Sequence, residues 1–329
     1  MSSISHGSDS SASFPADEEL ESVVSALLHV DPSGQRFARV FRETFDQLYD
    51  GQRTGRYKWE QLYKTEKTHF GTLIEINLQR EFAFDDGVIL DYRIAGVEVD
   101  CKYSFRDGGW MLPPESWGLI VLVAIANDEH STWSIGVVRA TDDHRRTSVN
   151  RDGKTTLNQD GRLAIRWIFR SAGFSPNVLL QLADEDVALI FEAKTGQGRL
   201  DQLFRLAQER RIHRNTIATV AQQQDYMKRV RANGGSRSNL QAEGFLIPGG
   251  DYAAHRRVAA QFGVPIPEPG EVVSFRVAPA GPDDPIAVKL EGRLWRRASQ
   301  DETLVVPAPV LHTAKRTDAS EREQPWSAD

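Results

Sequence analysis

The residues of this sequence best suited to chemistry are acidic side chains and one lysine near residue 100. Asp91 stands before a predicted hairpin turn at Ala95-Gly96, and Asp100 and Lys102 stand after it. Because side chains alternate along a strand, Glu98, Asp100 and Lys102 are expected on one face, and a folded hairpin would bring Asp91 near that face. Two neighbouring carboxylates repel each other, and a bound cation would offset this repulsion, so the pair is a candidate binding site for Mg²⁺.

A metal ion held there would polarise a phosphodiester and lower the pKa of a bound water, which are the two roles that hydrolysis needs. Lys102 could hold or deprotonate the attacking water and stabilise negative charge on the phosphate. Glu75 lies in a helix predicted just upstream and is a plausible third acid. The candidate catalytic residues are Glu75, Asp91, Asp100 and Lys102, and the candidate metal ligands are Glu75, Asp91, Asp100 and the backbone carbonyl of Cys101.

A plainer interpretation of the same residues is that they line the solvated face of a hairpin. An Asp followed at some distance by Asp-x-Lys is a degenerate pattern that a chain of 329 residues could contain by chance. The spacing alone therefore leaves both interpretations open.

The helices and strands predicted around these residues indicate a mixed α/β domain. Apolar residues recur at helical spacing through Glu18–Asp50, and Asp31–Gly34 breaks this stretch into two helices. A third helix is predicted from about Thr68. The predicted strands are Val88–Ile94, Val97–Phe105, Leu119–Ala126 and Trp133–Arg139, and Arg162–Phe169 is predicted to be helical.

A second domain is predicted after a linker at Ser171–Pro176, a stretch rich in turn-forming residues. The length of 329 residues is large for one compact core, which also favours two domains. Predicted helices in this half are Asp186–Lys194, Gly198–Arg211, Arg214–Val220 and Gln222–Ala232; predicted strands are Phe245–Ile247, Val272–Val277 and Ile286–Leu294.

The stretch Ile212–Arg231 is typical of a helix-turn-helix, and the strand around Phe245 would suit a wing. Between Arg205 and Arg237 eight basic residues face two acidic ones, a local charge of +6 in a chain of net charge −6. Binding to DNA depends on the local field rather than on the total. The candidate DNA-binding residues are Arg214, Asn215, Thr216, Gln222, Gln223, Gln224, Lys228, Arg229, Arg231 and Arg237.

A basic helix can equally be a solvated surface whose charges lie near its C-terminal end, where the helix dipole favours them. Other features bound the class of protein. Cys101 is the single cysteine, which excludes an internal disulfide, and the longest apolar run, Gly118–Ala126, has the length of a strand rather than of a membrane span. These features fit a cytoplasmic protein.

Long strings of this sequence resemble the two-site (type IIE) restriction endonucleases of the PD-(D/E)xK nuclease superfamily. The resemblance runs from Asp17 to about Val305 and is far more specific than the short motif within it. The strings that carry it are Asp46–Arg56, Lys64–His69, Ile94–Lys102, Trp110–Ser116, Ile217–Gln223 and Met227–Arg231.

The resemblance implies a PD-(D/E)xK mixed-sheet domain followed by a winged-helix domain of the catabolite-activator type. It implies Mg²⁺-dependent cleavage of double-stranded DNA by a homodimer that binds two copies of a palindrome like GCCGGC, with no nucleotide cofactor and no membrane. The family's acidic and lysine positions fall on Glu75, Asp91, Asp100 and Lys102, and Leu90 replaces the proline of the superfamily name. The expected organisation is a disordered leader at 1–15, an endonuclease domain at 16–170, a linker at 171–176, a winged-helix domain at 177–311 and a polar tail at 312–329.

Three other functions compete with this one. A non-catalytic winged-helix regulator would need no Mg²⁺, and a nicking repair nuclease would share the metal site but cut one strand. Leu48–Gly51 is similar to the Lys-x-Asp-Gly motif of DNA ligases, but leucine cannot form a covalent adenylate. Leu48 is therefore interpreted as a core residue of its helix.

Overall fold

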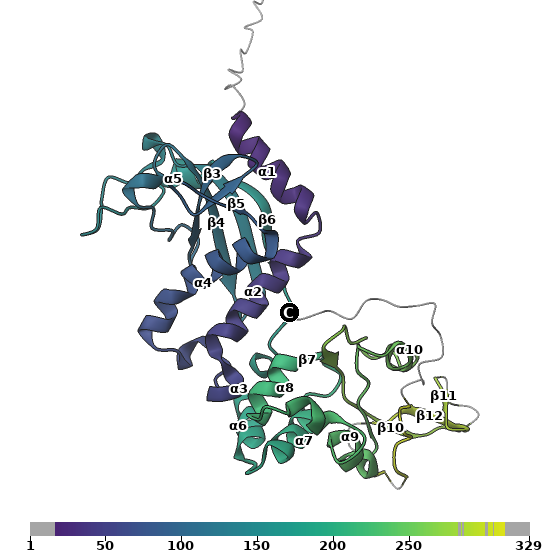
Figure 1. The fold of residues 1–329 in the computed structure, drawn as a ribbon. Coiled ribbons are helices and arrows are strands. Elements are labelled where there is room, and N and C mark those ends of the chain that lie inside the picture. The colour runs from purple at the N-terminus through teal and green to yellow at the C-terminus, as the bar shows by residue number, and fades with distance from the viewer. Residues whose placement is uncertain (1–16, 282–283, 285, 300–301, 305, 313–329) are drawn as a thin grey trace, which may run out of the picture. The chain divides into compact units, whose positions relative to one another are not determined.

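The computed structural model describes residues 17–312 except 282–283, 285, 300–301 and 305. Within this part the chain forms two compact units (Figure 1). Unit 1 consists of residues 17–45 with Tyr63–Ser175, and unit 2 consists of Asp46–Leu62 with residues 176–312. The segment Asp46–Leu62, which we expected in the first domain, thus packs with the second. The expected leader lies outside the described residues, as does the expected tail apart from His312.

Unit 1 begins with helices α1 (Glu18–Val30) and α2 (Gln35–Tyr49), followed after a short insertion by α4 (Lys64–Phe82). The predicted break between the first two is confirmed. The carboxylate of Asp31 accepts the backbone N–H groups of Arg36 and Phe37 at 2.8 and 3.0 Å, which satisfies donors that the start of α2 would otherwise leave open.

The described strands of unit 1 form a six-stranded mixed sheet in the order β1-β2-β3-β4-β5-β6. β3 and β4 run parallel, and every other neighbouring pair runs antiparallel. The strands are β1 (Asp85–Asp86), β2 (Tyr92–Ile94), β3 (Val97–Tyr103), β4 (Ile120–Asn127), β5 (Thr132–Arg139) and β6 (Arg166–Gly173), and the short helices between them are η2 (Pro114–Ser116), η3 (Asp142–His144) and α5 (Gln159–Leu163).

The two faces of this sheet are covered by different parts of unit 1. On one face, Trp133 packs against Phe37 and Phe41 of α2, with ring centroids 5.9 and 5.4 Å apart. On the other face, Val121 and Val123 of β4 join a buried cluster that is built from loop residues rather than from long helices. The other buried members of this cluster are Trp110, Leu112, Val138, Ala140, Leu157 and Ile165.

The predicted helix Arg162–Phe169 is wrong over its second half: helix α5 ends at Leu163, and strand β6 begins at Arg166. Its pairing with β5 shifts register around Ile135 and Gly136. As a result Phe169 stacks near Trp133 on one face while Trp167 lies near Trp110 on the other. Such a bulge breaks the strict alternation by which a strand is recognised. The predicted linker is also shorter than expected, because β6 continues to Gly173.

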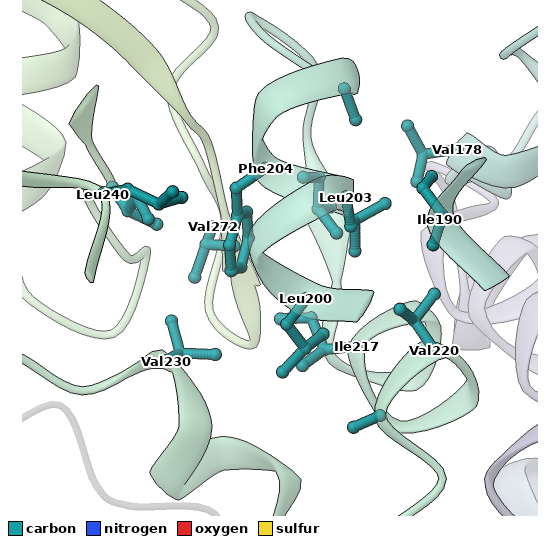
Figure 2. Packing of buried hydrophobic residues seen from close by; sticks show 14 of the residues in the cluster. Val178, Ile190, Leu200, Leu203, Phe204, Ile217, Val220, Val230, Leu240 and Val272 are labelled. Carbon is teal, nitrogen blue, oxygen red and sulfur yellow. The ribbon is translucent and has the colours of Figure 1, made fainter. Parts of the chain in front are cut away.

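Unit 2 is built around a core formed by α6, α7 and α8 (Figure 2). Its described strands form a four-stranded antiparallel sheet in the order β11-β12-β10-β8 and a separate pair β7-β9. The helices are α3 (Gly51–Thr54), η1 (Trp59–Gln61), η4 (Val178–Leu180), α6 (Asp184–Glu192), α7 (Gly196–Leu206), α8 (Arg214–Ala221), η5 (Tyr226–Val230), α9 (Ser236–Asn239), η6 (Gln241–Glu243) and α10 (Ala253–Gln261). The strands are β7 (Ile212–His213), β8 (Phe245–Leu246), β9 (Glu271–Val272), β10 (Phe275–Pro279), β11 (Val288–Leu290) and β12 (Arg293–Arg297).

Three predictions for unit 2 need correction. The predicted strand Val272–Val277 is two short strands in different sheets, because β9 ends at Val272 and pairs with β7, whereas β10 begins at Phe275 and pairs with β8 and β12. Gln222–Ala232 is not an α-helix: Gln222 adopts a left-handed conformation that ends α8, and a 3-10 segment, η5, follows. The predicted strand Ile286–Leu294 is a hairpin, because Glu291 and Gly292 both have positive φ and turn the chain between β11 and β12.

We predict that the ion pair between Arg42 and Asp128 is a main determinant of the stability of unit 1. Nη1 of Arg42 on α2 lies 2.5 Å from Oδ1 of Asp128 in the β4–β5 turn, and both side chains are buried. Asp128→Ala should lower the free energy of unfolding by about 3–5 kcal/mol, because it leaves a buried guanidinium without this partner. Urea denaturation measures this loss. Arg39→Ala, which breaks an exposed pair with Glu81, should cost less than about 1 kcal/mol, and equal losses for the two variants would contradict the prediction.

Candidate active site

The four predicted catalytic residues come together in unit 1. Asp91 directly precedes β2, Asp100 and Lys102 lie on β3, and Glu75 lies on α4. The ammonium of Lys102 donates to Asp100 and lies 3.4 Å from Oδ2 of Asp91. The same Asp91 oxygen accepts the backbone N–H of Cys101 at 2.8 Å. The hairpin therefore positions both aspartates and the lysine, as the alternation of side chains predicted.

Crowding of acids raises the proton affinity of this site. Burial raises the pKa of Glu75 to about 7, and the neighbouring Asp91 adds to this shift. Burial also raises the pKa of Asp100 to about 6, although Lys102 and Ser116 work against it. Burial alone would lower the pKa of Lys102, but neighbouring groups, chiefly Asp100 and Asp91, together outweigh it and leave this pKa above its ordinary value. The site is an acidic cluster that one internal cation partly neutralises.

The donor atoms of the site suit a hard divalent cation. Carboxylate and carbonyl oxygens are the ligands that Mg²⁺ prefers, and a divalent ion would favour the charged form of Glu75 against the burial and the nearby Asp91 that raise its pKa. Among the residues that the structure describes, however, no group of three or more His, Cys, Asp and Glu side chains is arranged to hold a metal ion. The Lys102 ammonium donates hydrogen bonds to the carboxylate of Asp100 and to the backbone carbonyl of Cys101, the latter at 2.9 Å. The ligand types therefore suit Mg²⁺, and in this structure Lys102 contacts three of the candidate ligands, namely Asp91, Asp100 and the Cys101 carbonyl.

Glu98 organises the loop that carries Asp91, a role that the sequence did not reveal. Its carboxylate accepts the backbone N–H groups of Val88, Ile89 and Leu90 at 2.9 to 3.1 Å. These three bonds lower the pKa of Glu98. The resemblance assigns Leu90 to the position of the superfamily proline, and proline has no N–H to donate. The leucine is therefore consistent with the way this loop is fastened.

Ser116 is a second residue that the sequence did not single out. Its hydroxyl is fully buried and donates to Oδ2 of Asp100 at 2.5 Å, so that Asp100 is held from two sides. On the opposite side of β3, the hydroxyl of Tyr92 donates to the backbone carbonyl of Glu75 at 2.6 Å and joins β2 to α4. Ser116 ends one of the strings that carry the family resemblance, which was the available signal.

The candidate DNA-binding residues of unit 2 divide into two groups. Several of them serve the packing of the unit: Thr216 is buried, the amide of Asn215 donates to Asp46 at 2.7 Å, and Nε of Arg237 donates to the carbonyl of Ile247 at 2.7 Å. Gln223 is half-buried and its backbone carbonyl accepts a bond from Gln52. Arg229 is also half-buried, 3.7 Å from Asp225. The exposed group consists of Arg214, Gln222, Gln224, Lys228 and Arg231.

The residues of the ligase-like motif have ordinary structural roles. Leu48 lies on α2 and is buried, as its periodicity predicted. Asp50 forms an exposed ion pair with Arg53. No helix in the described part of the chain is both long and apolar enough to cross a membrane.

The chain is similar to known restriction endonucleases. The model of the family "Restriction endonuclease NaeI" matches residues 21–307. A curated relative, the type II restriction enzyme NaeI of Lentzea aerocolonigenes, is 46% identical over 303 residues, which cover 90% of this chain and 95% of the relative. The chain therefore belongs to the NaeI restriction endonuclease family.

Proposed function

We propose that this member of a restriction endonuclease family hydrolyses double-stranded DNA at a short palindrome like GCCGGC, with Mg²⁺ as its cofactor. The observation that carries the proposal is the convergence of Asp91, Asp100 and Lys102 beside Glu75. We infer a cytoplasmic enzyme, since its substrate is DNA. Purified protein incubated with plasmid that carries several such sites should give discrete fragments in Mg²⁺ and none in EDTA. Intact DNA that is shifted on a gel under both conditions would favour a DNA-binding regulator instead.

The proposed reaction is attack of water on phosphorus, with cleavage of the bond to the 3′ oxygen and release of 3′-hydroxyl and 5′-phosphate ends. Bound Mg²⁺ would polarise the phosphodiester and acidify the attacking water. Asp91, Asp100, Glu75 and the Cys101 carbonyl would hold the ion. Lys102 has a raised pKa and stays protonated at neutral pH, so we assign it the orientation of the water and the stabilisation of negative charge rather than general-base catalysis.

Removal of either end of the Asp100–Lys102 pair should abolish cleavage. Asp100→Asn removes one metal ligand, and Lys102→Ala removes the cation that faces the phosphate, so each should lower the single-turnover rate by about 10³-fold or more. Gel analysis of a plasmid with mapped sites measures the rate. Lys64→Ala, an exposed lysine at the start of α4, is the matched control and should cleave normally. Wild-type cleavage by either active-site variant in Mg²⁺ buffer would contradict the catalytic roles assigned to Asp100 and Lys102.

Binding of the metal should be visible without any cleavage. A ligand that binds the folded state alone adds about 2.7 kcal/mol of stability at 100 times its dissociation constant, and a unit of this size gains about 2–4 °C per kcal/mol. We therefore expect Mg²⁺ to raise the melting temperature of the wild type above its value in EDTA, and to leave that of Asp100→Asn unchanged. Glu19→Gln, at an exposed acid on α1, should respond like the wild type. A melting temperature that ignores Mg²⁺ in all three proteins would argue against a metal site in the free enzyme.

We further propose that unit 2 is a winged-helix domain that binds a second copy of the DNA site, and that the enzyme works as a homodimer stimulated by this second site. In support, α7 and α8 pack against the short strands β7 and β9, as helices and strands do in that fold. Because Gln222–Ala232 is not a helix, the element that would follow α8 is the 3-10 segment η5 with α9. A supercoiled plasmid with two sites should then be cut faster than one with a single site.

Replacement of two arginines in this segment should weaken the second DNA site. Arg229→Ala/Arg231→Ala removes two positive charges near η5, so affinity for duplex DNA in Ca²⁺ should fall, and the slope of log K against log salt should flatten by about 1–2. Fluorescence anisotropy of a labelled duplex at several salt concentrations measures both. Arg205→Ala/Arg257→Ala is the matched control, because Arg205 is paired with Glu243 and Arg257 lies on α10. An unchanged slope in the first variant removes η5 from the DNA interface.

A further inference from the structure

A basic hairpin projects from unit 1 and has no part in the site described above. We name residues 145–157 the arm. Its two sides pair through a bridge between Arg145 and Leu157 and a bond from the N–H of Arg146 to the carbonyl of Thr156. Its tip is closed by a bond of 2.8 Å from the N–H of Asn150 to the carbonyl of Lys154. The arm is therefore a hairpin-like loop whose two sides are joined near its base and closed at its tip.

The base of the arm is fastened to the unit. Leu157 and Thr155 are buried, and Leu157 belongs to the cluster that covers one face of the sheet. Thr155 exchanges two backbone hydrogen bonds with Leu112, at 2.8 and 3.1 Å. The guanidinium of Arg145 lies 5.3 Å from the centre of the Trp117 ring. These contacts hold the arm in one direction relative to the segment 110–117.

The tip of the arm is basic and open to solvent. Every residue from Arg146 to Asp152 is exposed, and the side chain of Arg151 is 99% exposed. The arm holds four basic residues and one acidic residue, a local charge of +3 in a chain of net charge −6. Arg151 lies 3.9 Å from the carboxylate of Asp152, and an exposed pair of this kind contributes at most about 1 kcal/mol. The arginine is therefore available to a stronger anionic partner.

The arm lies on the same side of the sheet as Asp100 and Lys102. Asp100 and Lys102 of β3 are paired in register with Val121 and Val123 of β4, so their side chains leave the same face. These two valines pack in the cluster that contains Leu157 of the arm. Long helices do not build this face, because α2 packs on the other one. Ser116, which donates to Asp100, ends the segment to which the arm is fastened.

We propose that the arm enters the major groove of the DNA duplex that is cut, with Arg146 and Arg151 at the guanine edges and phosphates next to the scissile bond. The major groove is wide enough for a two-stranded ribbon, and arginine bonds the N7 and O6 acceptors of guanine with both arms of its fork. The bonds between Thr155 and Leu112 place the base of the arm one short stretch of chain from Ser116, which donates to Asp100. This inference rests on the proposed nuclease function, and it assigns to unit 1 the readout of the cleaved site.

The test compares the wild type with Arg146→Ala/Arg151→Ala by single-turnover cleavage of an oligonucleotide duplex in Mg²⁺. A second duplex carries 7-deazaguanine in the recognition site, which removes the N7 acceptor from the major groove and leaves base pairing intact. We expect the variant to cut the ordinary duplex at least 10-fold more slowly than the wild type. We also expect the wild type to lose rate on the modified duplex, and the variant to cut both duplexes at nearly the same rate.

Two controls keep the result interpretable. Arg39→Ala/Arg166→Ala removes the same charge from exposed arginines that pair with Glu81 and Glu21, and should behave like the wild type. Arg146→Lys/Arg151→Lys keeps the charge but loses the planar guanidinium, so it should retain phosphate binding and respond less to 7-deazaguanine than the wild type does. It also serves if the alanine variant has an altered melting temperature.

The experiment distinguishes a failure of the proposed nuclease function from a failure of the proposed role of the arm. A wild type that cuts no duplex in Mg²⁺ overturns the proposed function and the arm's role with it. A wild type that cuts, together with arm variants that keep both its rate and its response to 7-deazaguanine, overturns the arm's role alone and leaves the nuclease standing.

Discussion

Burial of neighbouring carboxylates that also repel one another is the constraint on which the candidate active site of unit 1 depends. Glu75, Asp91 and Asp100 are close enough for burial and like charge to raise the pKa of Glu75 to about 7. Such an arrangement costs free energy and relaxes unless the surrounding chain holds it. The bonds to Lys102, Ser116 and Glu98 supply that restraint, because each fixes either an acid or the loop that carries it.

The two faces of the sheet have different roles: one packs against helices, and the other carries Asp100 and Lys102. Aromatic side chains of α2 pack on Trp133 and close one face, while β3 sends Asp100 and Lys102 out of the other. Because β3 and β4 run parallel, the chain must travel a long connection between them, and this connection contains Ser116. One connection thus returns to Asp100 and also carries Leu112, to which the arm is fastened.

Unit 2 shows how contacts far apart in sequence decide which residues remain available to a partner. The segment Asp46–Leu62 packs against α8, where Asp46 engages Asn215 and Gln52 engages the carbonyl of Gln223. Two of the candidate DNA-binding residues are thereby joined to a segment that precedes them by some 170 positions in the chain. A polar residue on a predicted basic helix is therefore no guarantee of an open surface, since its side chain can satisfy the unit's own polar groups.

The sequence by itself determined the acid and lysine set, the helical break at Asp31, the hairpin around Ala95-Gly96 and the family, because all of these depend on local alternation, turn chemistry or long shared strings. It misread β6, where a register shift hides the alternation, and the stretch after α8, where the left-handed Gln222 ends the helix. Only the tertiary structure decided that Glu98 fastens the loop of Asp91, that Ser116 holds Asp100, and that Asp46–Leu62 belongs with unit 2. Each of these depends on pairing or packing between distant residues, and short-range spacing carries no information about which distant partners meet.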